Sequence, residues 1–377
     1  MVAIGTYSQD LGFVVGEGEG VYVASLSAVL SGESTAEVVI PKSFVANSSY
    51  VASFGDGAVC NLYALDERSD LEGGGRLVAY RVLEGGRVER LGEPRVCVDS
   101  DSCFVAATKT QVFVANYCGG GRADSVSGSV VAFGRDPETG ALIGEGRRCV
   151  PAAEKKVSFP RGDGADPLRQ KRSHLHMVLP TDSGLLVPDL GSDVVWRLSS
   201  DLADVSVACR LENGDGPRHC ALKHGHIFVL NELSCTLKVF DEKSGALLNT
   251  ADLFGERRKR GETATAAALV VANNAAYCSL RVVEGDGLVI KIPLDHQALP
   301  TEGLVETYST RGKMPRDILL LENDSLLLAA NQDSNSIVAF DVNPTTGDLI
   351  PRSPIFYAAH TPVCIVHLKT PAATVAK

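Results

Sequence analysis

A short apolar run, usually closed by a polar residue, recurs along the chain. Successive runs end 42 to 51 residues apart, except for one interval of 73 residues. A spacing of about 40 to 50 residues is typical of the blades of a β-propeller. The runs occupy residues 62–66, 112–116, 185–189, 227–231, 276–280 and 327–331.

Each run has similar neighbours, which together predict four strands per repeat. Another short apolar run lies upstream, as at residues 220–222. An alternating run follows downstream, as at residues 336–341, and then a turn cluster such as residues 343–347. Runs rich in β-forming residues and separated by turns indicate antiparallel sheets.

The two ends of the chain supply a seventh repeat. Residues 4–7 are similar to residues 114–117, and residues 362–367 can supply the strand that would precede them. Pairing the ends within one blade would close the ring and remove two exposed edges. We therefore predict an all-β fold: a seven-bladed β-propeller with four-stranded antiparallel blades, closed by pairing of the N- and C-terminal strands in one blade. Residues 1–377 would form a single domain.

The interval of 73 residues indicates an insertion. Residues from about 144 to 172 are rich in polar and charged side chains. We predict an inserted loop there on an otherwise regular blade. A loop of this length either covers a site or lies on the surface, and both alternatives stay open.

The composition and charge of the chain indicate which kinds of molecule it can bind. The formal net charge of −10 argues against nucleic acid, which needs a basic surface, although a few arginines could still bind a small anion. No apolar stretch approaches the roughly 18 to 20 residues of a membrane span, and the first residues lack a secretory signal. We expect a cytoplasmic protein with no membrane partner. Ten cysteines without a CxxC pair favour reduced core cysteines and no metal site.

Aligning the repeats on the apolar run shows two positions that repeatedly carry charged or polar residues. The first, at the start of the predicted inner strand, carries His176, Arg218 and Arg316. The second, directly after the next strand, carries Glu232, Arg281 and Gln332. Because propeller blades radiate from a central channel, equivalent positions should converge at one mouth.

Such a pocket suits a hydrolytic reaction on a substrate that carries an anionic group. Arginine offers a planar fork of donors for phosphate or carboxylate oxygens. A second arginine or a histidine could stabilise the oxyanion that forms when water attacks a carbonyl group. A carboxylate or a neutral histidine could take the proton from that water. We prefer Glu232 as this general base, with His176 as the alternative.

Several segments carry motifs that are weak singly but specific in their order and spacing. They are residues 216–219 followed by 228–233, residues 315–316 followed by 329–334, residues 174–176 with 187–191, and residues 115–117. Together they resemble the lactonase family of seven-bladed β-propellers, which includes the 6-phosphogluconolactonases and the fungal carboxy-cis,cis-muconate cyclases. The resemblance spans nearly the whole chain.

The resemblance implies a lactonase, acting most simply on 6-phosphogluconolactone in the pentose phosphate pathway, without a metal or other cofactor. It implies a small anionic lactone as the partner and a monomer or weak homo-oligomer. Two alternatives are a carboxy-muconate-type lactonising cyclase and a non-catalytic propeller that binds protein partners. Carried onto this chain, the catalytic residues are Glu232, His176, Arg218 and Arg281. The substrate-binding residues are Arg316, His219, Gln332 and Asn116, with a purely structural role as the alternative for His219 and Asn116.

The chain departs from the family pattern at three positions. Phe104 stands where relatives often carry histidine, and the apolar segment around Ala266 where they often carry a carboxylate and a histidine. Leu280 replaces the asparagine or aspartate that usually precedes the arginine. These differences leave the exact lactone, and whether activity is retained, open.

Overall fold

The apolar runs fold as buried strands because neighbouring sheets cover both of their faces. In the computed structural model, β18 (His226–Asn231) is buried almost throughout, whereas the outer strand β20 (Leu247–Asp252) of the same sheet is largely exposed. A strand that is buried on both faces can be apolar throughout, without alternating polar and apolar residues. The structure describes residues 1–33, 35–55, 59–68, 74–97, 99–118, 127–155, 166–301, 303–321, 323–357 and 359–369.

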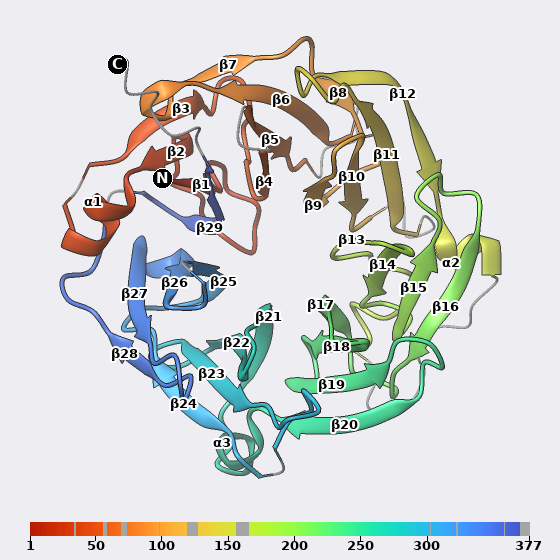
Figure 1. Ribbon diagram of the computed structural model, residues 1–377, viewed down its shortest axis with the longest axis vertical. Helices are drawn as coiled ribbons and strands as arrows, with labels where there is room; N and C mark the ends of the chain where they lie inside the picture. Colours follow the sequence, from red (N-terminus) through yellow and green to blue (C-terminus); the bar gives the residue numbers. More distant parts are fainter. Residues whose placement is uncertain are drawn as a thin grey trace.

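The described strands form seven antiparallel sheets arranged in a ring (Figure 1), six of four strands and one of five. The innermost strands are β29 (Pro362–His367), β4 (Val51–Gly55), β9 (Ser102–Ala107), β13 (Leu179–Thr181), β17 (Pro217–Lys223), β21 (Ala264–Val271) and β25 (Pro315–Leu321). The second strands are β1 (Val2–Thr6), β5 (Cys60–Asp66), β10 (Gln111–Asn116), β14 (Gly184–Asp189), β18, β22 (Ala275–Val282) and β26 (Leu326–Asn331). All six predicted apolar runs therefore form second strands.

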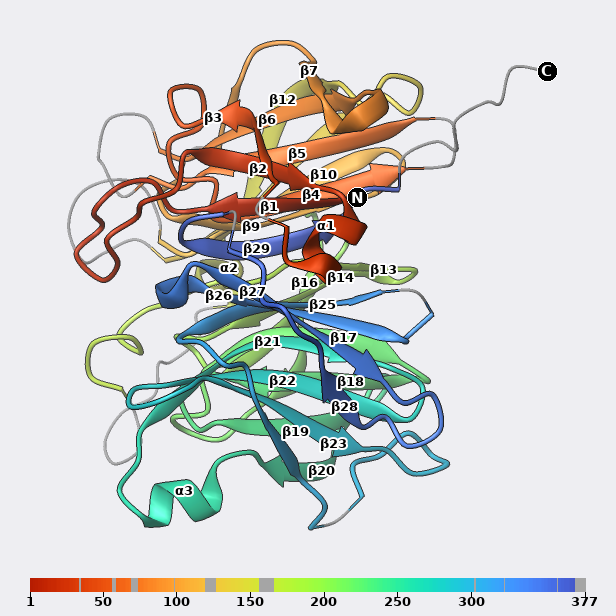
Figure 2. The same ribbon diagram turned by 90° about the vertical axis from the view of Figure 1, so that its left-hand side faces the viewer.

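The third and outer strands complete each blade. The third strands are β2 (Gly20–Ala24), β6 (Arg76–Val82), β11 (Ser129–Arg135), β15 (Val194–Leu198), β19 (Thr236–Asp241), β23 (Leu288–Pro293) and β27 (Ser336–Val342). The outer strands are β3 (Glu37–Pro41), β7 (Val88–Arg90), β12 (Leu142–Cys149), β16 (Val205–Arg210), β20, β24 (Glu306–Ser309) and β28 (Leu349–Pro351), with β8 (Arg95–Val96) also pairing with β6. Figure 2 shows the ring from its edge, with the strands running across and loops at both sides.

The predicted ring closure is confirmed. Strand β29 from the C-terminal part pairs antiparallel with β1, and Ile4 lies opposite Ile365. The blade therefore runs in the order β29, β1, β2, β3, and the first and last described strands lie side by side.

Helices are few and short within the described residues. They are α1 (Leu26–Ser31), α2 (Pro151–Lys155), α3 (Gly255–Lys259) and the 3₁₀ turns Glu84–Gly86 and Gln332–Ser334. None of the helices in this part of the chain is long and apolar enough to cross a membrane. All ten cysteines are free, and nine of them are buried.

The insertion begins later in the chain than predicted. Residues 144–149 belong to the regular outer strand β12, and helix α2 follows directly. The turn-rich residues 156–165 lie outside the described part of the chain. The described end of the insertion, from residue 166, leads back to the inner edge of the next blade.

A bulge recurs in four of the innermost strands, beside the last residue of the second strand. A fifth innermost strand, β21, has its register shift further from the end of β22. In β17 and β25 the extra residue is Arg218 and Arg316, respectively. A bulge re-aims the side chain of the extra residue. His176 occupies the equivalent place just before β13 rather than within that strand, and its backbone N–H donates to Pro188 O at 3.2 Å. The bulge thus presents equivalent residues to the axis of the ring.

Candidate active site

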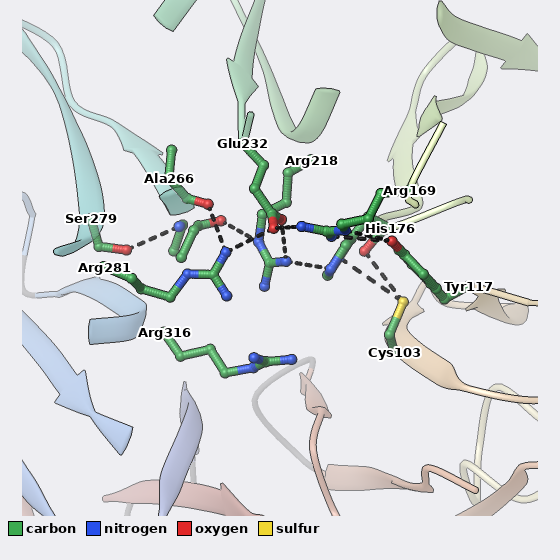
Figure 3. Close-up of polar contacts among 12 residues, drawn as sticks. Cys103, Tyr117, Arg169, His176, Arg218, Glu232, Ala266, Ser279, Arg281 and Arg316 are labelled. Atoms are coloured by element: carbon green, nitrogen blue, oxygen red, sulfur yellow. Dashed lines mark hydrogen bonds and ion pairs between the residues drawn. The ribbon is translucent and has the colours of Figure 1, made fainter. Parts of the chain in front are cut away.

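The buried carboxylate of Glu232 is the centre of a cluster of guanidinium groups. Figure 3 shows the side chains pointing toward one another at the centre of the ring. One carboxylate oxygen contacts Arg169 Nη1 at 2.5 Å and Arg281 Nη2 at 2.9 Å, and the other accepts from Arg218 Nη1 at 2.8 Å. Glu232 directly follows β18, and its backbone N–H donates to Gly216 O at 2.7 Å, which fixes the side chain at this end of the strand.

The charge balance keeps Glu232 ionised. Burial alone would raise its pKa, but the positive charges of Arg169, Arg281 and Arg218 outweigh burial and hold the pKa well below its ordinary value. A carboxylate in this state is a weak base. It is well suited to holding three guanidinium groups in fixed positions.

Arg218 connects the carboxylate to the imidazole of His176. Its Nε–H donates to Ala267 O at 2.8 Å, and its Nη1 also lies within hydrogen-bonding distance of His176 Nε2. Since arginine can only donate, Nε2 must be the unprotonated nitrogen of His176, and the ring proton sits on Nδ1. Burial and the charge of Arg218 both lower the pKa of His176 far below its ordinary value.

We expect His176 to stay neutral throughout the physiological pH range. The imidazole should show the Nδ1–H tautomer in ¹⁵N NMR spectra and should not titrate between about pH 5 and 8, where an unperturbed histidine does. Because its folded pKa is lowered, protonation would oppose folding, so its stabilising contribution is complete above the ordinary histidine pKa and declines below it. Titration of the His176 signals with a midpoint near 6.5 would contradict this arrangement.

Arg281 is another buried guanidinium of the cluster. It lies near the end of β22, is buried, and donates from Nη2 to Ala266 O at 3.2 Å. Its Nε is buried without a hydrogen-bond partner among the described residues. Burial lowers its pKa to about 10, with Glu232 acting in the opposite direction. The group therefore remains charged at neutral pH and retains an unused donor.

Arg316 reaches the same region from the bulge of β25. Its Nη2 donates to Tyr7 Oη at 2.8 Å, and its guanidinium lies 5.1 Å from the centre of the Tyr7 ring. In the part of the chain that the structure describes, Arg316 forms no ion pair. A cavity of about 10 Å³ is lined by Arg316 together with Ser49, Tyr50, Glu67, Cys103, His176, Arg218, His219 and Val363.

Arg169 was not among the residues expected from the sequence. It lies in the inserted segment, a third of its side chain is exposed, and it donates to Tyr117 Oη from Nε at 3.2 Å and from Nη2 at 3.1 Å. A repeat alignment cannot find it because an insertion has no counterpart in the other blades. The insertion therefore contributes a charge to the cluster.

The remaining candidates lie in different surroundings. The ring of His219 contacts Phe104 edge-on, with centroids 5.7 Å apart. The Gln332 amide donates to Asp333 Oδ1 at 2.8 Å, beside a separate groove. The Asn116 amide is used inside its own blade, where it bonds Ser102 and Ser129 side chains and Cys97 O. The structure thus brings His176, Arg218, Glu232 and Arg281 together, with Arg316 and His219 beside them, but not Gln332 or Asn116.

No cluster of histidine, cysteine, aspartate and glutamate side chains that could hold a metal ion occurs among the described residues.

Seven antiparallel blades with a cationic cluster at their centre define a β-propeller with a central polar site. The chain matches the family described as "Lactonase, 7-bladed beta-propeller" over residues 1–367 and belongs to it.

Similar proteins include several that carry a lactonase name. The 6-phosphogluconolactonase of Bacillus subtilis is 25% identical, covering 97% of each chain, and that of Formosa agariphila is 26% identical, covering 88% of this chain and 91% of the relative. The solved periplasmic gluconolactonase of Pseudomonas aeruginosa has a TM-score of 0.74 at 20% identity and covers 98% of this chain and 99% of its own. At that identity the structural likeness shows the fold alone.

Proposed function

We propose that the protein hydrolyses the lactone of a phosphorylated sugar acid, with 6-phosphogluconolactone as the substrate. One observation carries the proposal: four guanidinium groups gather at the centre of the ring, and three of them contact the carboxylate of Glu232. They belong to Arg169, Arg218, Arg281 and Arg316. On a chain with net charge −10, such a local excess of positive charge suits a small anion. The names of the relatives from Bacillus subtilis and Formosa agariphila support the same substrate.

The arginines divide into two groups with different tasks. Arg316 has no ion-pair partner among the described residues, so its guanidinium is available for the phosphate or another anionic group of the substrate. Arg218 and Arg281 are held by Glu232 and by backbone carbonyls. Donors that are fixed in this way can stabilise the oxyanion that develops at the lactone carbonyl without reorganising.

The test is an assay of phosphorylated and unphosphorylated sugar lactones side by side, at matched concentrations. We expect kcat/KM to be at least about tenfold higher for 6-phosphogluconolactone than for gluconolactone, because a charge-assisted hydrogen bond contributes about 1.5–3 kcal/mol. High salt should reduce the preference.

Equal rates for the two lactones would show that the guanidinium groups do not recognise phosphate. Carboxy-cis,cis-muconate belongs in the same assay. Its conversion, without hydrolysis of any sugar lactone, would replace the proposed activity with lactone formation from a diacid.

A further inference from the structure

A second buried carboxylate, that of Glu67, occupies the position in its blade that Glu232 occupies in another. Glu67 directly follows the end of β5, as Glu232 directly follows the end of β18. The side chains are 7% and 2% exposed, respectively. The two carboxylates therefore reach the centre of the ring from equivalent positions, but their surroundings differ.

Among the described residues, no guanidinium group forms an ion pair with Glu67. Its Oε2 accepts from Tyr7 Oη at 3.1 Å, and Tyr7 in turn accepts from Arg316. Tyr7 thus connects the carboxylate to Arg316. Burial raises the pKa of Glu67, and the charge of Arg316 only partly opposes this effect. Glu67 is consequently a stronger base than Glu232, whose oxygens both contact guanidinium groups.

The cavity beside Glu67 has the size and polarity for a water molecule. Its volume of about 10 Å³ is near the minimum that one water needs. Ser49 lines it, and the Ser49 side chain is 4% exposed. Ser49 Oγ lies close enough to Glu67 to lower its pKa slightly, yet it has no hydrogen bond of good geometry with any described residue. A water here would satisfy that hydroxyl and contact the carboxylate.

We propose that Glu67 is the general base of the reaction and that the water it activates is held between Glu67 and Ser49. This assignment rests on the proposed lactone hydrolysis. The water oxygen bonds to the lactone carbonyl carbon while one of its protons passes to the Glu67 carboxylate. The carbonyl electrons move onto the oxyanion, next to the guanidinium groups. When the ring C–O bond breaks, Glu67 returns the proton to the leaving oxygen, so water is added across the ester bond and Glu67 is regenerated.

The groups facing Glu67 bear on its titration. They are Tyr7 after β1, Asp101 just before β9, Cys103 on β9, Cys118 after β10 and Arg316 on β25, together with Tyr50, His176, Arg218 and His219 across the shared cavity. The charge of Arg316 lowers the pKa of Glu67 and that of Asp101 raises it, but burial has the largest effect. The acid limb of kcat/KM should therefore belong to Glu67. The limb exists because only the ionised form acts as the base, and it should lie above the ordinary glutamate pKa of 4.5 because burial raises the pKa of Glu67.

The experiment compares three substitutions on the full chain with 6-phosphogluconolactone as substrate. Glu67→Gln keeps the shape and the acceptor for Tyr7 but removes the base. We expect kcat to fall by about 10² to 10⁴ with little change in KM, and the acid limb of the pH profile to vanish. Glu67→Asp should recover part of the rate and keep an acid limb. Glu306→Gln, in an outer strand, is the matched control and should retain the unaltered rate, since Lys291 keeps Asp348 as its partner.

The outcomes separate the two proposals. Near-normal kcat in Glu67→Gln, with hydrolysis by the unaltered protein, would overturn the assignment of Glu67 and leave the lactonase proposal intact. A rate loss with an unchanged acid limb would also overturn it, since a structural role could cause the loss. Absence of hydrolysis by the unaltered protein would overturn both.

Discussion

Arg218→Ala is expected to lower kcat/KM for lactone hydrolysis by about 10² to 10³, because it removes a donor held ready for the oxyanion. The guanidinium bonds three groups at once: Glu232, His176 and the carbonyl of Ala267. Without it, each of these three groups loses a hydrogen-bond partner at the centre of the ring. Arg218→Lys should restore little, because a lysine offers a single point charge in place of a planar fork. The measurement is steady-state kinetics, with a melting curve to establish that the variants fold.

Arg169→Ala is the matched control for this prediction. Arg169 contacts the same carboxylate, but it lies on the insertion with a third of its side chain exposed. If Arg218 acts at the reacting carbonyl, the Arg169 variant should lose about tenfold or less. Equal losses in both variants would instead indicate that each arginine only balances the charge of Glu232.

The repeat alignment was sufficient to place much of the cluster. His176, Arg218, Glu232 and Arg281 come from different blades, yet equivalent positions in radiating sheets meet near the axis. The alignment could not show that the bulges re-aim Arg218 and Arg316, because a bulge is a register shift that appears only once the strands pair. The predicted ring closure needed only the similarity between the ends of the chain.

Asn116 lies away from the cluster for a simple geometric reason. Asn116 is the last residue of β10, and side chains alternate along a strand, so its amide turns into the blade while the next residue, Tyr117, contacts Arg169. Glu67 has the same sequence signal as Glu232, a carboxylate directly after a second strand, but its blade has no arginine at the inner position.

The second large effect is expected in stability, from Glu232→Gln. The amide keeps the shape but leaves Arg169, Arg218 and Arg281 facing one another without a counter-charge. Breaking a buried ion pair costs about 3–5 kcal/mol, so the free energy of unfolding should fall by that order. Chemical denaturation measures it, and Glu306→Gln, whose ion pair is partly exposed, should change it by less than about 1 kcal/mol.

Inorganic phosphate should restore much of the stability lost in Glu232→Gln, because an anion that binds only the folded state raises its unfolding midpoint. The acid response should change as well. The folded pKa of Glu232 is lowered, so its contribution is complete above the ordinary value of 4.5 and is lost as the pH falls through the folded pKa. Glu232→Gln should lack that part of the acid unfolding. A variant as stable as the unaltered protein, with no response to phosphate, would show that the guanidinium groups are held by their backbone contacts and not by the charge of Glu232.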